Sequence, residues 1–314
     1  MEICYNITMK NQREQNKISL LGDYTPAKTA GTAFSVASVL PTLLFFVLLI
    51  VLSLFGLTKQ ENYAQSDWYL YLSFLTPQIA FLILVLWAFR YSKQSKAAIL
   101  RSQKCRLKYY MIAILLQIGL LSLSELNSLF LRVLESIGYE GSEIRLPSLD
   151  GFGFCGVLIV VALFPAVMEE VMFRGVLLGG LRSFKTGWAV VICGALFSLY
   201  HQNPAQTVYQ FCCGACFALV VVRSGSVLPT MLAHFLNNAF ILILTKVGVA
   251  SFSTPVLIAI VIPSAICLLG TLAYLIFFDK SAPCRDGDTS EKKRFLKYAS
   301  VGIVVCAIVW ITGL

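Results

Sequence analysis

The segment Thr32–Leu57 reads TAFSVASVLPTLLFFVLLIVLSLFGL and contains no charged residue. A transmembrane helix needs about 20 mainly apolar residues to cross a hydrocarbon core about 30 Å thick, so this segment is long enough to span a bilayer. It follows a polar stretch over residues 1–30, whereas a cleaved signal peptide would stand at the extreme N-terminus. We therefore expect a retained membrane anchor.

Similar apolar segments recur along the whole chain. Of the 314 residues, 58% are hydrophobic and 13% are charged, against roughly 25% charged in an average soluble domain. The expected fold is therefore all-α, a polytopic transmembrane helical bundle of about eight to nine spans. The candidate spans are residues 32–57, 68–89, 109–131, 152–181, 187–201, 206–222, 229–247, 254–278 and 299–314, of which the fifth, sixth and ninth are short.

The distribution of charge predicts the topology. Between the spans, segment 90–108 carries only basic charges and segment 134–150 mostly acidic ones. Because cytoplasmic loops are enriched in Lys and Arg, segment 90–108 and the N-terminus are expected to be cytoplasmic. The net charge of +9 is then explained by topology and by attraction to anionic lipid, so the bilayer is an expected partner and nucleic acid is not.

Ionisable residues at membrane depth mark function by default, and the fourth span contains Glu169-Glu170-Val-Met-Phe-Arg174. Adjacent helical residues point about 100° apart, so the two glutamates are expected to have different roles. Glu170 lies four residues before Arg174, which is the favourable direction for an ion pair. Glu169 is then left as a candidate general base.

The chain has only two histidines, His201 and His234, and each lies in an apolar segment near a polar residue. Glu169 precedes Lys185 by as many residues as His201 follows it, so a hairpin turning at Lys185 would place the two side chains at similar depth. Phe197 is one helical turn from His201 and is expected to pack against its ring. The plainer interpretation is that each histidine only joins two helices.

His234 and Asn238 are also one turn apart and therefore share a helix face. Together they have the groups to hydrogen-bond an oxyanion, or to give a nitrogen and an oxygen to a metal ion. His201 is followed by Gln202, so the H-E-x-x-H pattern of a standard zinc protease is absent from the sequence.

These three clusters resemble those of the CPBP family of intramembrane proteases, which includes the CAAX prenyl endopeptidase called Ras-converting enzyme and bacterial Abi (bacteriocin-immunity) proteins. The family pattern is E-E-x-x-x-R, F-x-x-x-H and H-x-x-x-N. The chain matches it in order and spacing, at Glu169 to Arg174, Phe197 to His201, and His234 to Asn238.

The resemblance implies an intramembrane endopeptidase in which Glu169 and His201 activate a water. It also implies that His234 and Asn238 stabilise the oxyanion and that Glu170 and Arg174 support the site. The family has been described both as metalloproteases and as metal-independent glutamate proteases. Zinc, if present, would be held by Glu169, His201, His234 and Asn238; we favour a water activated by glutamate without metal, because Asn is a poor zinc ligand.

Four parts are expected: a cytoplasmic tail over 1–30, N-terminal spans over 31–150, a catalytic core over 151–250, and C-terminal spans over 251–314. The expected substrate is a membrane-anchored protein or peptide, and the expected location is a bacterial plasma membrane. One alternative is a non-proteolytic scaffold or bacteriocin-immunity protein that binds a membrane partner. A proton-coupled transporter would show an inverted repeat, and none is found in the sequence.

Overall fold

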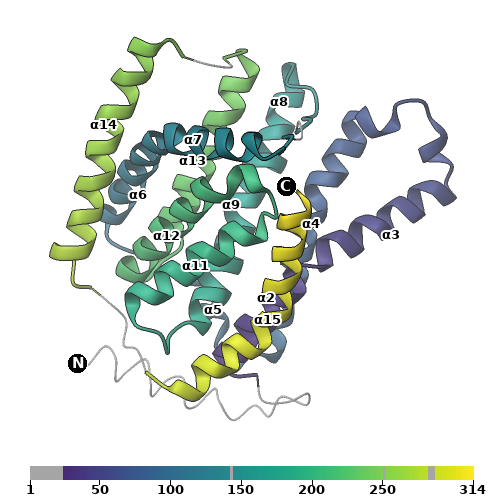
Figure 1. The fold of residues 1–314 in the computed structure, drawn as a ribbon. Helices are drawn as coiled ribbons and strands as arrows, with labels where there is room; N and C mark the ends of the chain where they lie inside the picture. Colours follow the sequence, from purple (N-terminus) through teal and green to yellow (C-terminus); the bar gives the residue numbers. More distant parts are fainter. Residues whose placement is uncertain (1–23, 142–143, 250–251, 282–286) are drawn as a thin grey trace.

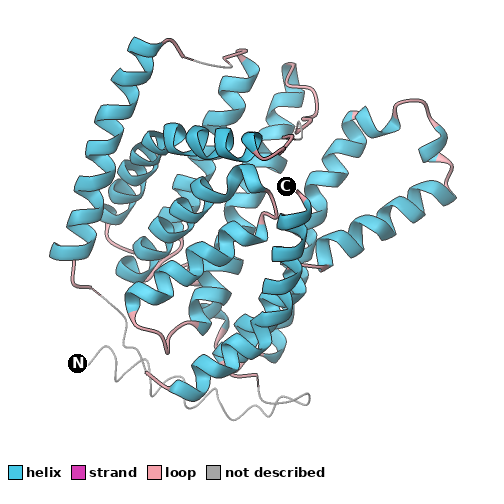
Figure 2. Ribbon diagram, viewed as in Figure 1, coloured by secondary structure: helices cyan, strands magenta, loops and turns pink. Residues whose placement is uncertain are grey.

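The structure is a computed structural model that describes residues 24–141, 144–249, 252–281 and 287–314. The described residues are helical without a strand (Figure 2). They form eight helices long and apolar enough to cross a membrane, and a shorter apolar helix, α11 (Thr186–Tyr200). The all-α transmembrane bundle is therefore confirmed; residues 1–23 of the expected tail lie outside the described residues.

Figure 1 shows the arrangement of these helices. The helices outside the expected core of residues 151–250 are α2 (Pro26–Ala37), α3 (Leu40–Leu54), α4 (Asp67–Tyr91), α5 (Lys96–Leu100), α6 (Leu107–Leu120), α7 (Ser124–Ser136), α14 (Thr254–Ala273), η7 (Tyr274–Phe278) and α15 (Thr289–Thr312). The remaining helices are α8 (Gly151–Val157), η4 (Leu158–Leu163), α9 (Phe164–Glu169), η5 (Glu170–Leu177), α10 (Leu178–Gly180), α11, α12 (Thr207–Ser224) and α13 (Leu228–Lys246).

The first apolar segment is two helices rather than one. It begins at Pro26, earlier than expected, because Thr25 caps the helix and Pro26 occupies its first turn. The helix then breaks at Ser38–Val39, ahead of Pro41 in the first turn of α3. Proline restricts the residue before it and cannot donate a helical hydrogen bond, which accounts for the break.

The helices of the sixth and ninth apolar segments also differ in length from the expected spans. The sixth and ninth segments, expected to be short, belong to apolar helices of 21 residues (Pro204–Ser224) and 24 residues (Thr289–Thr312). The ninth begins about three turns earlier than its apolar residues because the Asp288 side chain caps it by accepting from the Ser290 N–H. Hydropathy alone therefore located the span and missed its polar first turns.

The fourth span is continuous from Gly151 to Gly180 but becomes π-helical twice along its length. Segments η4 and η5 are π-helical, with α9 between them. Pro165, in the first turn of α9, has no N–H for the carbonyl one turn before it, which favours wider winding there. π-helical turns occur frequently at functional sites, and η5 begins at Glu170.

The outside of the bundle is apolar. Helix α3 packs mainly against α4 and leans away from the other helices (Figure 1). Its side chains Phe46, Ile50 and Leu54 are all exposed. An apolar surface of this extent is suited to lipid rather than water, so the protein is an integral membrane protein.

The basic loops gather at one end of the bundle. The Lys93 N–H donates to the carbonyl of Tyr24, and the Val227 N–H donates to the carbonyl of Arg101. The Arg223 side chain likewise donates to the carbonyl of Leu275 in η7 and to that of Ser281 in the segment after it. These described segments therefore lie together at one end of the bundle.

At the same end, an ion pair joins α6 to the segment after η7. The Lys108 ammonium donates to Asp279 Oδ2 over 2.9 Å, and the Ser281 N–H donates to Oδ1 over 3.0 Å. Burial alone would raise the pKa of Asp279, but these two hydrogen bonds lower the pKa to about 2.

Helices α11 and α12 approach closely where glycines face each other. A Cβ on Gly194 would lie 2.8 Å from the Phe211 carbonyl oxygen, and one on Gly214 would lie 2.9 Å from the Gly194 Cα. Small residues let helix backbones pack tightly in membranes. This contact fixes the end of α11, where Phe197 and His201 lie.

Candidate active site

The innermost part of the site is a fully buried ion pair. Glu170 Oε1 accepts a 2.7 Å hydrogen bond from Arg174 Nη1, and both side chains are 0% exposed. Glu170 Oε2 accepts from the Thr230 hydroxyl, also over 2.7 Å. The Arg174 guanidinium lies 4.2 Å from the centre of the Phe197 ring, a cation–π distance. The i,i+4 pair expected from the sequence is present, and Thr230 joins it to α13.

His234 lies between the two glutamates. Its Nδ1 is 3.2 Å from Glu170 Oε1, and its Nε2 is 4.0 Å from Glu169 Oε2. Because the carboxylate can only accept, Nδ1 carries the proton of that bond. Helix α13 thus connects the buried glutamate to the one that faces the cavity.

His201 is fixed by the chain that precedes it. The residue caps the end of α11, and its Nδ1 donates to the Phe197 carbonyl oxygen over 2.8 Å. A carbonyl accepts only, so in the neutral ring Nε2 is the nitrogen that keeps its lone pair. The Phe197 ring packs edge-on against the imidazole with centroids 4.8 Å apart. The sequence expectation of ring packing is met, and the backbone bond adds control of the tautomer.

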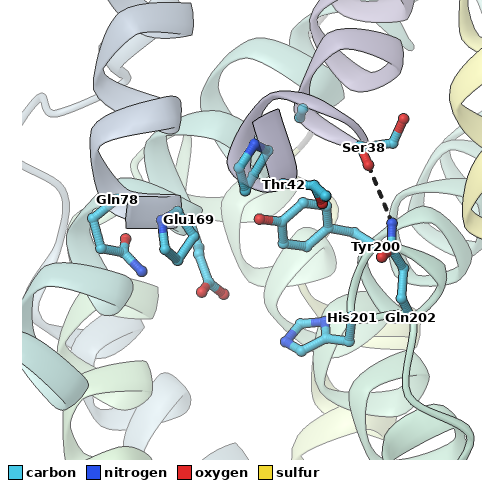
Figure 3. Close-up of a pocket in the computed structure, with 10 residues that line it drawn as sticks. Ser38, Thr42, Gln78, Glu169, Tyr200, His201 and Gln202 are labelled. Atoms are coloured by element: carbon cyan, nitrogen blue, oxygen red, sulfur yellow. Dashed lines mark hydrogen bonds between the residues drawn. The ribbon is translucent and has the colours of Figure 1, made fainter. Parts of the chain in front are cut away.

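Glu169 and His201 line the same cavity, which has a volume of about 220 Å³. Figure 3 shows the Glu169 carboxylate, the His201 ring and the Tyr200 hydroxyl directed into this space. The Glu169 side chain keeps 13% of its surface exposed, whereas that of Glu170 keeps none. The two adjacent glutamates therefore differ as the helix geometry predicted: one faces the cavity and the other lies in the protein interior.

The other wall of the cavity comes from helices outside the three sequence clusters. The break between α2 and α3 contributes Ser38 and Thr42, and α4 contributes Gln78. Gln202, next to His201, has a left-handed backbone with φ of 51°. Its side chain donates to the Ser38 carbonyl over 3.2 Å, which joins the histidine turn to α2. A non-glycine residue in this conformation is held by its surroundings, as is common at active sites.

Asn238 is not hydrogen-bonded to Glu169, His201 or His234 in the described part of the chain. Its Oδ1 accepts from Asn237 Nδ2 over 3.1 Å. Asn237 Oδ1 in turn accepts from Gln117 Nε2 over 2.6 Å and from the Tyr209 hydroxyl over 2.7 Å. With its oxygen engaged, Asn238 has its amide N–H groups left to donate elsewhere.

Several of these residues were not found from the sequence. Thr230 could have been predicted as a site residue, because it lies one turn before His234 and therefore shares its helix face. Tyr200 and Asn237 adjoin residues that were identified, but adjacent helical positions face different directions. Gln78 lies in α4, outside all three clusters, and only its polarity within an apolar span marks it.

Among the described residues, no group of three or more His, Cys, Asp or Glu side chains is arranged to hold a metal ion. Nδ1 of each histidine faces a fixed acceptor, the Phe197 carbonyl or Glu170, which leaves Nε2 as the other nitrogen of each ring for a water, a substrate or a metal ion.

A carboxylate and an imidazole facing one cavity inside a transmembrane bundle define a candidate membrane-embedded hydrolase. Residues 151–240 match the family described as type II CAAX prenyl endopeptidase Rce1-like. This segment of the chain is Rce1-like, and the resemblance to the CPBP proteases is confirmed. It contains every residue of the three clusters, and the match supports a protease-type hydrolase in general. Comparison with curated proteins and with solved structures finds no match.

Proposed function

We propose that the protein is an intramembrane endopeptidase that hydrolyses a peptide bond of a membrane-anchored protein or peptide. The observation that carries this proposal is the placement of the Glu169 carboxylate and the His201 imidazole in one cavity. A scaffold that only binds a partner has no need of a base beside a fixed imidazole. The Rce1-like match over residues 151–240 adds to this argument.

In the proposed reaction, Glu169 takes a proton from a water molecule whose oxygen attacks the carbonyl carbon of the scissile bond. His201 Nε2 accepts the second water hydrogen as a hydrogen bond and so orients the attack. The carbonyl oxygen becomes an oxyanion. When the C–N bond breaks, the protonated Glu169 gives its proton to the leaving nitrogen. The products are a carboxylic acid and an amine, and transfer of the remaining water proton from the acid to the amine leaves a carboxylate and an ammonium group.

The contacts of His234 assign it a role. Its Nδ1 lies 3.2 Å from Glu170 Oε1 and its Nε2 lies 4.0 Å from Glu169 Oε2, so the ring stands between the buried carboxylate and the one that lines the cavity. In the proposed reaction the imidazolium donates from Nδ1–H to Glu170, and its Nε2–H stabilises the oxyanion together with the amide of Asn238.

The test uses the purified protein in liposomes with two synthetic probes. One is a farnesylated peptide with a C-a-a-X end, and the other is the same peptide anchored by an N-terminal acyl chain. Glu169→Gln and His201→Ala are each expected to lower kcat by about 10²–10⁴-fold. Glu125→Gln is the matched control, because Glu125 is an exposed glutamate of α7.

The two probes also separate the substrate classes. Cleavage of the farnesylated peptide alone assigns CAAX processing, and cleavage of both assigns anchored peptides in general. Full activity in Glu169→Gln, with normal abundance in the membrane, would contradict the proposal and favour the scaffold.

We further propose that the basic end faces the cytoplasm of a bacterial cell, with the N-terminus on that side. The clustering of the basic loops supports this orientation. Alkaline phosphatase fused to the N-terminus is then expected to stay inactive, because it folds only outside the cytoplasm, where disulfides form. An active fusion would reverse the orientation.

A further inference from the structure

Gln78 is a buried amide that faces the cavity without a partner for its oxygen. The side chain is 7% exposed, and Oε1 has no hydrogen-bond partner in the described part of the chain. Thr76, two residues before it and also buried, satisfies its hydroxyl by donating to the Leu72 carbonyl. A buried polar atom without a partner is unfavourable, so its retention at a cavity needs an explanation.

The position of Gln78 on α4 directs its amide toward the reacting groups. Gln78 follows Pro77, which interrupts the hydrogen bonding of the helix. Both residues line the cavity that Glu169 and His201 line. Figure 3 shows the Gln78 amide and the Glu169 carboxylate side by side at the cavity, from the neighbouring helices α4 and α9. No hydrogen bond joins the two side chains among the described residues.

The chemistry of this side chain matches a peptide unit. A primary amide presents an acceptor oxygen and donor N–H groups in one plane, as the backbone of an extended peptide does. A transmembrane or lipid-anchored peptide must unwind before its backbone can be hydrolysed, and its freed N–H and C=O groups then need partners in a site without bulk water. Oε1 is itself shielded from the cavity and has no bond to lose, so a half-turn of the amide presents it to one of those N–H groups without breaking a hydrogen bond.

We propose that Gln78 binds the substrate backbone next to the scissile bond, accepting a peptide N–H at Oε1 and donating from Nε2 to a peptide carbonyl. This inference rests on the proposed function and adds a substrate-binding residue to it. Gln78 lies outside the Rce1-like segment of residues 151–240. The contact recognises the backbone and therefore tolerates varied side chains in the substrate.

The test compares Gln78→Leu with wild type on the acylated and farnesylated peptides. Loss of the backbone contacts is expected to lower kcat/KM about tenfold for each hydrogen bond lost. Thermal stability is expected to stay equal or to rise, since leucine removes a buried polar atom that has no partner. A merely structural glutamine would instead lose stability together with activity. Gln210→Leu is the matched control, because Gln210 is a half-buried glutamine of α12 away from the cavity.

A second measurement identifies the contact on the substrate. Each backbone nitrogen of the probe is methylated in turn, which removes one N–H at a time. One position near the scissile bond is expected to lower wild-type kcat/KM about tenfold and to have no further effect in Gln78→Leu. Unchanged kcat/KM in Gln78→Leu, or methylation effects that simply add to it at every position, would overturn the inference.

Failure of the inference and failure of the proposed function give different results. If Glu169→Gln abolishes cleavage while Gln78→Leu cleaves like wild type, only the role of Gln78 is refuted. If wild type cleaves neither peptide, or Glu169→Gln cleaves like wild type, the proposed function is refuted and the substrate role of Gln78 with it.

Discussion

Arg174→Met tests how the buried cluster is held together. The substitution removes the 2.7 Å hydrogen bond to Glu170 and leaves that carboxylate, which is 0% exposed, without its cation. Breaking a buried ion pair by removing one partner costs about 3–5 kcal/mol. At about 2 °C per kcal/mol for a large domain, the melting temperature is expected to fall by about 6–10 °C.

The double variant Glu170→Leu/Arg174→Met separates stability from activity. It removes both charges, and with them Arg174 Nε and Nη2, which have no hydrogen-bond partner in the described part of the chain. Replacing a buried ion pair by apolar residues is often neutral or stabilising by about 1–4 kcal/mol. The melting temperature is therefore expected to return to the wild-type value or above it. Activity is not expected to return, because His234 Nδ1 has lost the carboxylate it contacts.

The assay follows thermal unfolding in detergent with a maleimide dye that becomes fluorescent when it reacts with a thiol. Cys193 and Cys213 are buried, so they react as the bundle opens. Peptide hydrolysis is measured on the same samples. Melting of Arg174→Met within about 2 °C of wild type, or a double variant as unstable as the single one, would refute this role of the ion pair.

Three further expectations concern positioning, packing and pH. Asn237→Leu frees the Asn238 oxygen and is expected to lower kcat about tenfold with little change in KM, since oxyanion contacts form in the transition state. A rise in KM as large as the fall in kcat would argue against a positioning role. Gly194→Val is expected to unfold the protein or to reduce its abundance in the membrane, because a Cβ there would lie 2.8 Å from the next helix; normal abundance and melting would contradict the close packing. The pKa of Asp279 is lowered to about 2 in the folded protein. Its ionised form therefore stabilises the fold fully above the unfolded pKa of about 4, and this stabilisation is lost as the pH falls through 2. The melting difference between wild type and Asp279→Asn is therefore expected to be constant from pH 7 to about 5 and to shrink only in stronger acid; a difference that stays constant down to about pH 2 would show that the pKa is not lowered.

The sequence and the tertiary structure decided different features of this protein. The sequence alone predicted the membrane spans, because hydropathy over about 20 residues is a local property. It also predicted the Glu170–Arg174 pair and the different surroundings of Glu169, since i,i+4 spacing and a 100° step are fixed by the helix itself. The three clusters were enough to reveal the resemblance to the CPBP proteases before any fold was known.

The tertiary structure decided which helices meet those clusters. The contact of His234 with Glu170 joins residues 64 positions apart, and the hydrogen bond from Gln117 to Asn237 spans 120 positions. The cavity wall opposite Glu169 comes from α4 and the break between α2 and α3, where the sequence offered only a proline and isolated polar residues. Such contacts depend on how whole helices pack against one another, and in a membrane that packing is set by small residues and polar side chains rather than by hydropathy.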